Sequence, residues 1–203
     1  MTKKFGSPIQ PRPLFALALV TLALCALLIA PINRAAAIQS ASPAPTTVIL
    51  VRHAEKKVVP PENKDPDISP EGQVRAEELA RMFGAAGIGA IYASQYKRTQ
   101  QTAKPLADKL GVAVTKVEAR NTADLVKQIR AGAAGQVVLV VGHNNTVPEV
   151  IAALGGPKLP IIPETDYDNL FILTVQSDGT AKLLAMKYGS AVPPRGDQSM
   201  PKP

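Results

Sequence analysis

The sequence is poor in aromatic residues and in cysteine. It has no tryptophan, its aromatic residues make up 4% of the chain, and its one cysteine, Cys25, lies inside an apolar run. A single thiol excludes an intrachain disulfide and a cluster of thiolate ligands. Few aromatics and no dense run of Lys or Arg give little support for nucleic-acid binding. A domain without disulfides must be stabilised by its own apolar core.

The long uncharged run stands near the start of the chain. Lys3, Lys4 and Arg12 precede the apolar stretch 14–30, and three alanines at 35–37 follow it. This order is typical of a secretory signal, here segment 1–37 with cleavage after Ala37. The alternative is an uncleaved anchor, because the stretch is barely long enough to span a bilayer. Either way we expect export to the periplasm or secretion, with membrane contact only if the segment stays attached.

The net charge depends on that cleavage. Of the 23 basic residues, Lys3, Lys4, Arg12 and Arg34 lie in the predicted signal, whereas all 16 acidic residues lie beyond it. The formal net charge of +7 therefore becomes 19 − 16 = +3 for the remainder. Single basic residues near a pocket suit an anionic small molecule better than a nucleic acid.

Composition divides the rest of the chain into three parts. Residues 38–46 are small, polar and rich in proline, which predicts a linker. Segment 47–189 holds the periodic apolar runs and is the predicted domain. The last residues, 190–203, contain prolines and few apolar side chains, which predicts a disordered tail.

Strands and helices are expected to alternate along the domain. Apolar runs predict strands at 48–51, 88–94, 112–117 and 136–141, and a hairpin of 169–175 and 180–188 around the turn at 176–179. Helices are expected at 70–83, 95–111, 122–132 and 146–156. This order predicts an α/β three-layer sandwich, with helices flanking a mostly parallel central sheet and an antiparallel hairpin at one end.

Two of the predicted helices carry specific expectations. The first begins at Ser69-Pro70-Glu71 and ends at Gly84, with its apolar face formed by Val74, Leu79, Met82 and Phe83. Pro105 is expected to kink the second helix or to break it.

The chain has two histidines, and both follow valine-rich strands. His53 follows the run at 48–51, beside Arg52, and His143 follows the run at 136–141, which we expect at the centre of the sheet. Because ligands of α/β sheets bind beyond the carboxyl ends of the strands, both imidazoles should open into one crevice. Arg98, which follows the second strand, is expected at the same rim.

These residues favour phosphoryl transfer over other chemistries. A metal site would be disfavoured among arginines, and neither a serine-hydrolase elbow nor a P-loop is present. Guanidinium groups bind phosphate oxygens, and a neutral imidazole can attack phosphorus. One nucleophile among phosphate-binding donors suits phosphoryl transfer without a metal or organic cofactor.

Three blocks together resemble the histidine phosphatase superfamily, also called the phosphoglycerate mutase-like family. They are the "RHAE" of 52–55, the "ASQYKRTQQTA" of 93–103 and the "VVGHNNT" of 140–146, in the family's order and spacing. The resemblance covers about 47–188 and implies the family's fold and a phosphatase activity. The absence of a long insertion resembles the short branch that lacks a lid.

The resemblance also implies a role for each matching position. His53 would be the nucleophile that becomes phosphorylated, and Arg52 and Arg98 would bind the phosphoryl oxygens. His143 would be a further catalytic donor. Asn145 and Glu55 would bind substrate, with a salt bridge or a loop-orienting role as the alternative for Glu55.

Two departures from the family pattern concern the backbone and the general acid. Ala54 replaces the usual glycine of the signature. Asn144 stands where acid-phosphatase branches have an aspartate, and Glu118 is the only acid near the place where mutase-like branches have a glutamate. A solvated charge at a strand end is the favoured interpretation of Glu118. The missing acid resembles the branch that cleaves phosphohistidine or other good leaving groups.

The sequence therefore predicts an exported phosphatase that hydrolyses a phosphate monoester or phosphoramidate through a phosphohistidine at His53. One alternative is a non-catalytic phosphate-binding member of the same fold. The other is an envelope protein that binds a metal through His53, His143 and Glu55.

Overall fold

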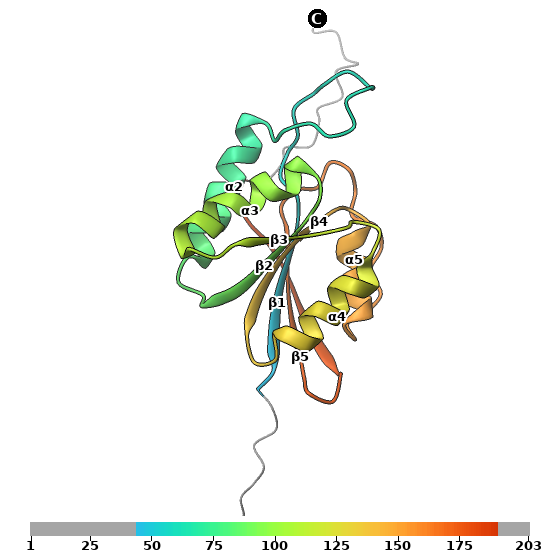
Figure 1. Cartoon of the computed structure of the whole chain (residues 1–203). Coiled ribbons are helices and arrows are strands. Elements are labelled where there is room, and N and C mark those ends of the chain that lie inside the picture. Colours follow the sequence, from blue (N-terminus) through green and yellow to red (C-terminus); the bar gives the residue numbers. More distant parts are fainter. Residues whose placement is uncertain (1–43, 191–203) are drawn as a thin grey trace, which may run out of the picture. The chain divides into compact units, whose positions relative to one another are not determined.

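The computed structural model describes residues 44–190 (Figure 1). The predicted signal segment, the start of the predicted linker and residues 191–203 of the predicted tail lie outside this range. Strand β1 (Thr46–Arg52) begins one residue before the predicted domain. None of the helices within 44–190 is long and apolar enough to cross a membrane.

Six strands form one sheet in the order β3-β2-β4-β1-β5-β6. The strands are β1, β2 (Ile88–Ser94), β3 (Val114–Val117), β4 (Val137–Gly142), β5 (Asn169–Val175) and β6 (Ala181–Lys187). The prediction that the run at 136–141 is central is confirmed, because β4 lies between β2 and β1.

The prediction of a mostly parallel sheet is wrong, because the sheet is mixed. The β3-β2, β2-β4 and β4-β1 pairs are parallel, whereas the β1-β5 and β5-β6 pairs are antiparallel. The C-terminal hairpin of β5 and β6 lies at one end of the sheet, as expected. It pairs through β5 with β1 and supplies two of the six strands. The start of β5 therefore lies at the same edge of the sheet as the carboxyl ends of β1 and β4.

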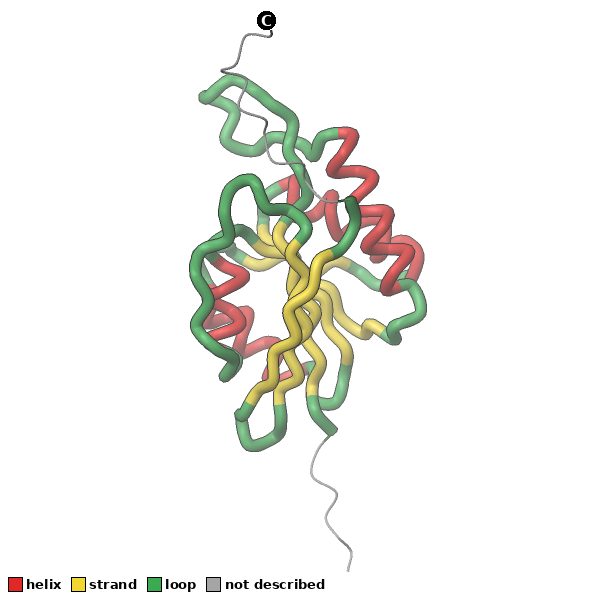
Figure 2. Tube along the Cα trace, turned by 180° about the vertical axis from the view of Figure 1, so that it is seen from behind, coloured by secondary structure: helices red, strands yellow, loops and turns green. Residues whose placement is uncertain are grey.

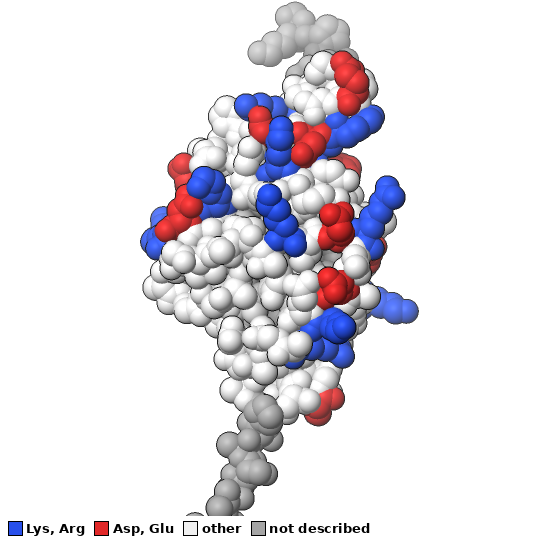
Figure 3. Space-filling model, in the orientation of Figure 1, with Lys and Arg blue, Asp and Glu red and all other residues white. Residues whose placement is uncertain are grey.

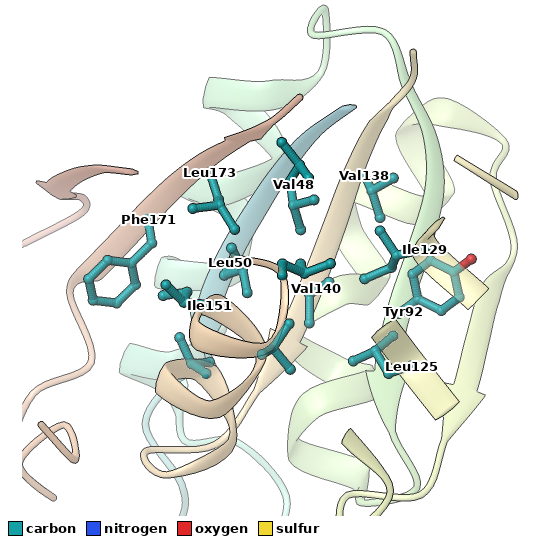
Figure 4. Packing of buried hydrophobic residues seen from close by; sticks show 14 of the residues in the cluster. Val48, Leu50, Tyr92, Leu125, Ile129, Val138, Val140, Ile151, Phe171 and Leu173 are labelled. Carbon is teal, nitrogen blue, oxygen red and sulfur yellow. The ribbon is translucent and has the colours of Figure 1, made fainter. Parts of the chain in front are cut away.

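Helices cover both faces of the sheet, as expected (Figures 1 and 2). They are α2 (Pro70–Phe83), α3 (Lys97–Leu110), α4 (Thr122–Gly132) and α5 (Thr146–Ala153). The side chains that alternate along β1 explain the two layers. Val48 and Leu50 belong to the core cluster with α4 and α5, and Ile49 and Val51 to the cluster with α2 and α3. Figure 4 shows the first of these clusters, with Leu125 and Ile129 of α4 packed over Val138 and Val140.

The start of α2 is as expected, but its buried face is different. The Ser69 hydroxyl accepts a hydrogen bond from the Gly72 amide, and Gly84 ends the helix. Val74 and Met82, expected in the core, are exposed, whereas Arg75, Ala76 and Leu79 are buried. The helix turns its small residues and one arginine towards the loop after β1, where Ala76 packs on Ala54.

Helix α3 continues through Pro105 from Lys97 to Leu110, so the break considered there is wrong. The helix ends at Gly111 in the left-handed conformation, as its sequence predicts.

The loop after β1 approaches α2 so closely that residue 72 must be glycine. A Cβ atom at Gly72 would lie 2.3 Å from the carbonyl oxygen of Glu55 and 3.1 Å from its amide nitrogen. Both are backbone atoms, so no side-chain rotation relieves the clash.

We expect Gly72→Ala to destabilise the domain by about 1–3 kcal/mol, because backbone must move to admit the methyl group. The free energy of unfolding from urea titration checks this. Gly132→Ala is the matched control, since no atom lies within 4 Å of a Cβ there. It should be neutral or stabilise by up to about 1 kcal/mol. Equal effects of the two substitutions would contradict the steric argument.

Candidate active site

The two histidines lie side by side because the strands before them are paired. Arg52 of β1 pairs with Gly142 of β4, and the His53 amide donates to the Gly142 carbonyl at 2.9 Å. His53 and His143 follow these paired residues directly. Their ring centroids are 5.4 Å apart and both side chains are buried. The structure thus brings the two imidazoles together at the carboxyl edge of the parallel strands, as the sequence predicts.

The backbone fixes the tautomer of His53. Its Nδ1 lies 2.8 Å from the carbonyl oxygen of Ala54, which can only accept a hydrogen bond. Nδ1 therefore carries the proton, and the lone pair is on Nε2. The Ala54 amide is itself bound by the Thr102 hydroxyl of α3 at 2.9 Å, which holds this turn of the backbone in place.

Both imidazoles are neutral at ordinary pH. Burial lowers the pKa of His53 to about 3, opposed by its hydrogen bond to Ala54 and assisted by the charges of Arg52 and Arg98. Burial, followed by the charges of Arg98 and Arg52, lowers the pKa of His143 to about 4. A neutral imidazole with its lone pair on Nε2 is the form that can act as a nucleophile.

A pair of hydroxyl groups holds His143. Its Nε2 lies 2.9 Å from the Ser94 hydroxyl at the end of β2, and that hydroxyl lies 2.8 Å from the Thr99 hydroxyl of α3. The Thr99 hydroxyl donates to the Tyr96 carbonyl at 2.8 Å, so Ser94 donates to Thr99. The neutral His143 ring therefore donates from Nε2 to Ser94. This leaves a lone pair on Nδ1. The His143 amide donates to the Thr146 hydroxyl at 2.8 Å.

The Arg52 side chain is buried and held by the segment 163–166, before β5. Its Nη1 donates to the carbonyls of Pro163 (2.8 Å) and Asp166 (3.2 Å), and its Nη2 pairs with the Glu164 carboxylate at 2.6 Å. The guanidinium also lies 4.3 Å from the Tyr167 ring centroid. Nε and the second N–H of Nη2 are left for an anion, while the other three N–H groups of the guanidinium are engaged by the chain itself.

Arg98, at the start of α3, is half-buried on the other side of the crevice. Its Nη1 lies 3.6 Å from the Asp65 carboxylate, and its guanidinium lies 4.4 Å from the Tyr96 ring centroid. Asp65 also accepts a hydrogen bond from the Lys97 amide at 2.9 Å. Through Asp65, the loop 53–69 thereby accepts a hydrogen bond from the first turn of α3 and also positions the Arg98 side chain.

The Nε atoms of Arg52 and Arg98 are buried without a hydrogen-bond partner among residues 44–190. An unpaired buried N–H group costs free energy of about 1–3 kcal/mol, which an anion in the crevice would recover. Two such donors beside two imidazoles are what a phosphoryl group requires.

The structure places Glu55 on Arg75 of α2. Both carboxylate oxygens accept from Arg75 Nε at 3.0 Å, and Oε1 also accepts from Nη2 at 2.7 Å. Arg75 donates in addition to the carbonyls of Tyr188 (2.8 Å) and Ser190 (2.9 Å). These contacts agree with the salt bridge that was the alternative to substrate binding by Glu55.

Of the two asparagines after His143, it is Asn144 that contacts the site. Its Nδ2 donates to Glu164 at 2.9 Å. Asn145, predicted to bind substrate, is the exposed cap residue of α5 and makes no side-chain capping bond. Glu118 is exposed, as the favoured interpretation of it expects.

Sequence reasoning missed the contacts from segment 157–168, for which it predicted no element. Glu164 and Tyr167 of this segment reach Arg52. The sequence signal for these contacts was the polar stretch "ETDYDN" immediately before a predicted strand. This stretch reaches Arg52 only because β5 is antiparallel to β1. Tyr96, Ser94, Thr99 and Thr102 lie in or beside the second block and had no assigned role.

The sequence was compared with models of known protein families. Residues 48–121 match the family model "Histidine phosphatase superfamily (branch 1)", a stretch that contains His53 and Arg98. This part of the chain is similar to the histidine phosphatase superfamily. A search of curated protein sequences found no match.

Solved structures with the same fold include several phosphatases of this family. The protein histidine phosphatase SixA complexed with tungstate has a TM-score of 0.56 and 18% identity, covering 70% of this chain and 96% of its own. The putative phosphohistidine phosphatase SixA from Agrobacterium tumefaciens has a TM-score of 0.55 and 21% identity, covering 72% and 99%. The mycobacterial glucosyl-3-phosphoglycerate phosphatase Rv2419c has a TM-score of 0.53 and 16% identity, covering 71% of this chain and 99% of its own. At these identities the likeness concerns the fold.

The alternative of a metal centre has no support in the geometry. Within residues 44–190, no group of three or more His, Cys, Asp or Glu side chains is placed to hold a metal ion. Glu55, the third ligand of that alternative, is bound to Arg75.

The buried neutral histidines predict a stability that falls in mild acid. With a pKa of about 3 in the folded state against 6.5 as the ordinary value, His53 takes up its proton mainly in the unfolded state. The unfolded chain therefore binds more protons between these values, and the free energy of unfolding should decrease as pH falls from about 6.5 towards 4.

Urea titrations across pH 4–8 measure this dependence, and His53→Gln should have a shallower slope than the wild type over this range. A slope that is the same in both proteins would show that His53 is not buried in the neutral form.

Proposed function

We propose that the protein is an exported phosphatase that hydrolyses a phosphate monoester or a phosphoramidate through a phosphohistidine intermediate at His53. The observation that carries the proposal is the pair of buried neutral imidazoles with ring centroids 5.4 Å apart, next to two arginine Nε–H groups that lack partners among the described residues. The match of residues 48–121 to the histidine phosphatase superfamily supports a phosphatase. The substrate class rests on the residues at the site.

In the first step, the lone pair of His53 Nε2 attacks phosphorus, and the bond from phosphorus to the leaving group breaks. The leaving group takes the electron pair. The Nε–H groups of Arg52 and Arg98 stabilise the charge on the equatorial oxygens, and His143 adds a donor when its second ring nitrogen is protonated. These groups are held before substrate arrives by Ser94, by segment 163–166 and by Asp65, so little reorganisation accompanies the step.

In the second step, a water oxygen attacks phosphorus, and the electron pair of the P–N bond returns to His53 Nε2. Inorganic phosphate leaves, and the proton of the water passes to phosphate or solvent. The proposal uses neither Glu55 nor Glu164 as a general acid, because each is paired with an arginine. The proposal therefore favours leaving groups that depart without help from a general acid.

The surface supports a small substrate. On the face shown in Figure 3, basic and acidic side chains of the described residues are intermixed, and no extended basic patch is visible there. An extended basic stripe is the feature that marks nucleic-acid binding.

His53→Ala should abolish turnover of phosphate esters and phosphoramidates, with a loss of at least about 10³-fold, because the nucleophile is removed. Incubation with a ³²P-labelled substrate, followed by denaturation in alkali, should leave label on the wild type and none on the variant. His143→Ala should lower kcat by about 10²–10⁴-fold and still become labelled.

This assay also separates the enzyme from a non-catalytic phosphate-binding protein. Such a protein would bind vanadate or phosphate but would release no product and acquire no label. That outcome would overturn the proposed activity.

Export is proposed from the sequence of segment 1–37. In a bacterium that expresses the full chain, the mature protein should be found in the periplasm or the medium with Ile38 at its N-terminus, as measured by mass spectrometry. Ala37→Glu should block cleavage, because the site before the cut requires a small residue. A wild-type protein that retains residues 1–37 in the membrane fraction would support the anchor instead.

A further inference from the structure

Glu164 lies at the mouth of the phosphoryl pocket and makes contacts that the reaction itself does not require. Its Oε2 accepts from Arg52 Nη2 at 2.6 Å, and its Oε1 accepts from Asn144 Nδ2 at 2.9 Å. The side chain is 68% exposed, whereas Arg52 beneath it is 1% exposed. The carboxylate thus sits between the buried arginine and solvent.

Each of the two phosphate-binding arginines has one carboxylate at this rim. Glu164 pairs with Arg52, and Asp65 pairs with Arg98 at 3.6 Å. Because both imidazoles are neutral, these two acids balance the two guanidinium charges. The phosphoryl group gains directed N–H donors in a pocket with almost no net positive charge, and the group attached to phosphorus meets a negative rim.

The charge of Glu164 is felt inside the pocket. Burial and the charges of Arg98 and Arg52 lower the pKa of His143, and Glu164 acts against them. Burial also lowers the pKa of Arg98, where Asp65, Tyr96 and Glu164 act in the opposite direction. Glu164 is therefore close enough to both His143 and Arg98 to influence their charge.

We propose that Glu164 determines specificity: its carboxylate, fixed by Arg52 and Asn144 at the mouth of the pocket, favours a phosphoryl group carried on a protonated nitrogen base and disfavours leaving groups with a further negative charge. The proposal rests on the proposed function and narrows it to phosphoramidates of the imidazole type. Attraction and repulsion at this distance are modest for an exposed carboxylate, and they act on selectivity between substrates.

The chemistry of such a substrate fits a site without a general acid. A phosphorylated imidazole that is protonated on its second nitrogen carries positive charge beside phosphorus. When His53 Nε2 attacks, the P–N bond of the substrate breaks and its electron pair stays on the substrate nitrogen. The base leaves as neutral imidazole, so no proton has to be supplied during the step. Water then releases phosphate from His53 as described above.

The test compares three substrates on the purified full-length protein and on Glu164→Gln. Phosphoimidazole has a leaving group that can be protonated, phenyl phosphate has no additional charge, and 2-carboxyphenyl phosphate has an additional negative charge. Glutamine keeps the size of the side chain and an oxygen that accepts from Arg52. The ratio of kcat/KM for phosphoimidazole over that for 2-carboxyphenyl phosphate should fall about two- to fivefold in Glu164→Gln.

The matched control is Glu78→Gln, which removes a carboxylate from an Arg–Glu pair on the surface of α2, with Arg81. It should leave all three kcat/KM values unchanged. An unchanged ratio in Glu164→Gln would overturn the proposal while the proposed function stands. Equal acceleration of all three substrates would also overturn it, since Glu164 would then simply compete with phosphate for Arg52.

Failure of the proposed function gives a different result. The wild type would then turn over none of the three substrates and would acquire no phosphoryl label on His53, and the inference about Glu164 would fall with it. Thermal melting of Glu164→Gln and the wild type, each with and without vanadate, shows whether the variant is folded and whether its pocket still binds an anion.

Discussion

The burial of the Arg52 guanidinium is the constraint on which the rest of the site depends. A charge at the end of a central strand is costly unless it is paired and hydrogen-bonded. Three partners come from segment 163–166, which can reach Arg52 because β5 runs antiparallel to β1 and begins at the edge where β1 ends. The contacts to Arg52 therefore require the mixed sheet. If β5 were parallel to β1, its carboxyl end would lie at this edge and segment 163–166 would lie at the opposite edge.

The same buried charges keep the histidines in their reactive form. Two arginines and two imidazoles share a small volume, so protonating either ring would add a third cation to a site with little water. Burial contributes most to the low pKa values, and the neighbouring guanidinium groups add to it. The features that make the crevice suitable for an anion also provide an uncharged nucleophile within it.

The sequence predicted the strands, the helices and the convergence of His53 with His143 because these depend on local patterns and on the pairing of parallel strands. It did not predict which contacts surround Arg52, because those come from a segment more than a hundred positions away whose place is set by strand direction. The apolar face of α2 was mispredicted for a similar reason. Hydropathy cannot indicate that Arg75 is buried unless its partners Glu55 and Tyr188 are known.

The contacts of Arg75 connect the two ends of the domain. One side of its guanidinium binds Glu55, two residues after the nucleophile, and the other side binds the carbonyls of Tyr188 and Ser190, where the described chain ends. The turn at His53 and residues 188–190 are therefore held by a single cation. Loss of residues 188–190 would remove two acceptors from Arg75 and loosen the backbone beside His53, so this distant segment contributes to the order of the loop after β1.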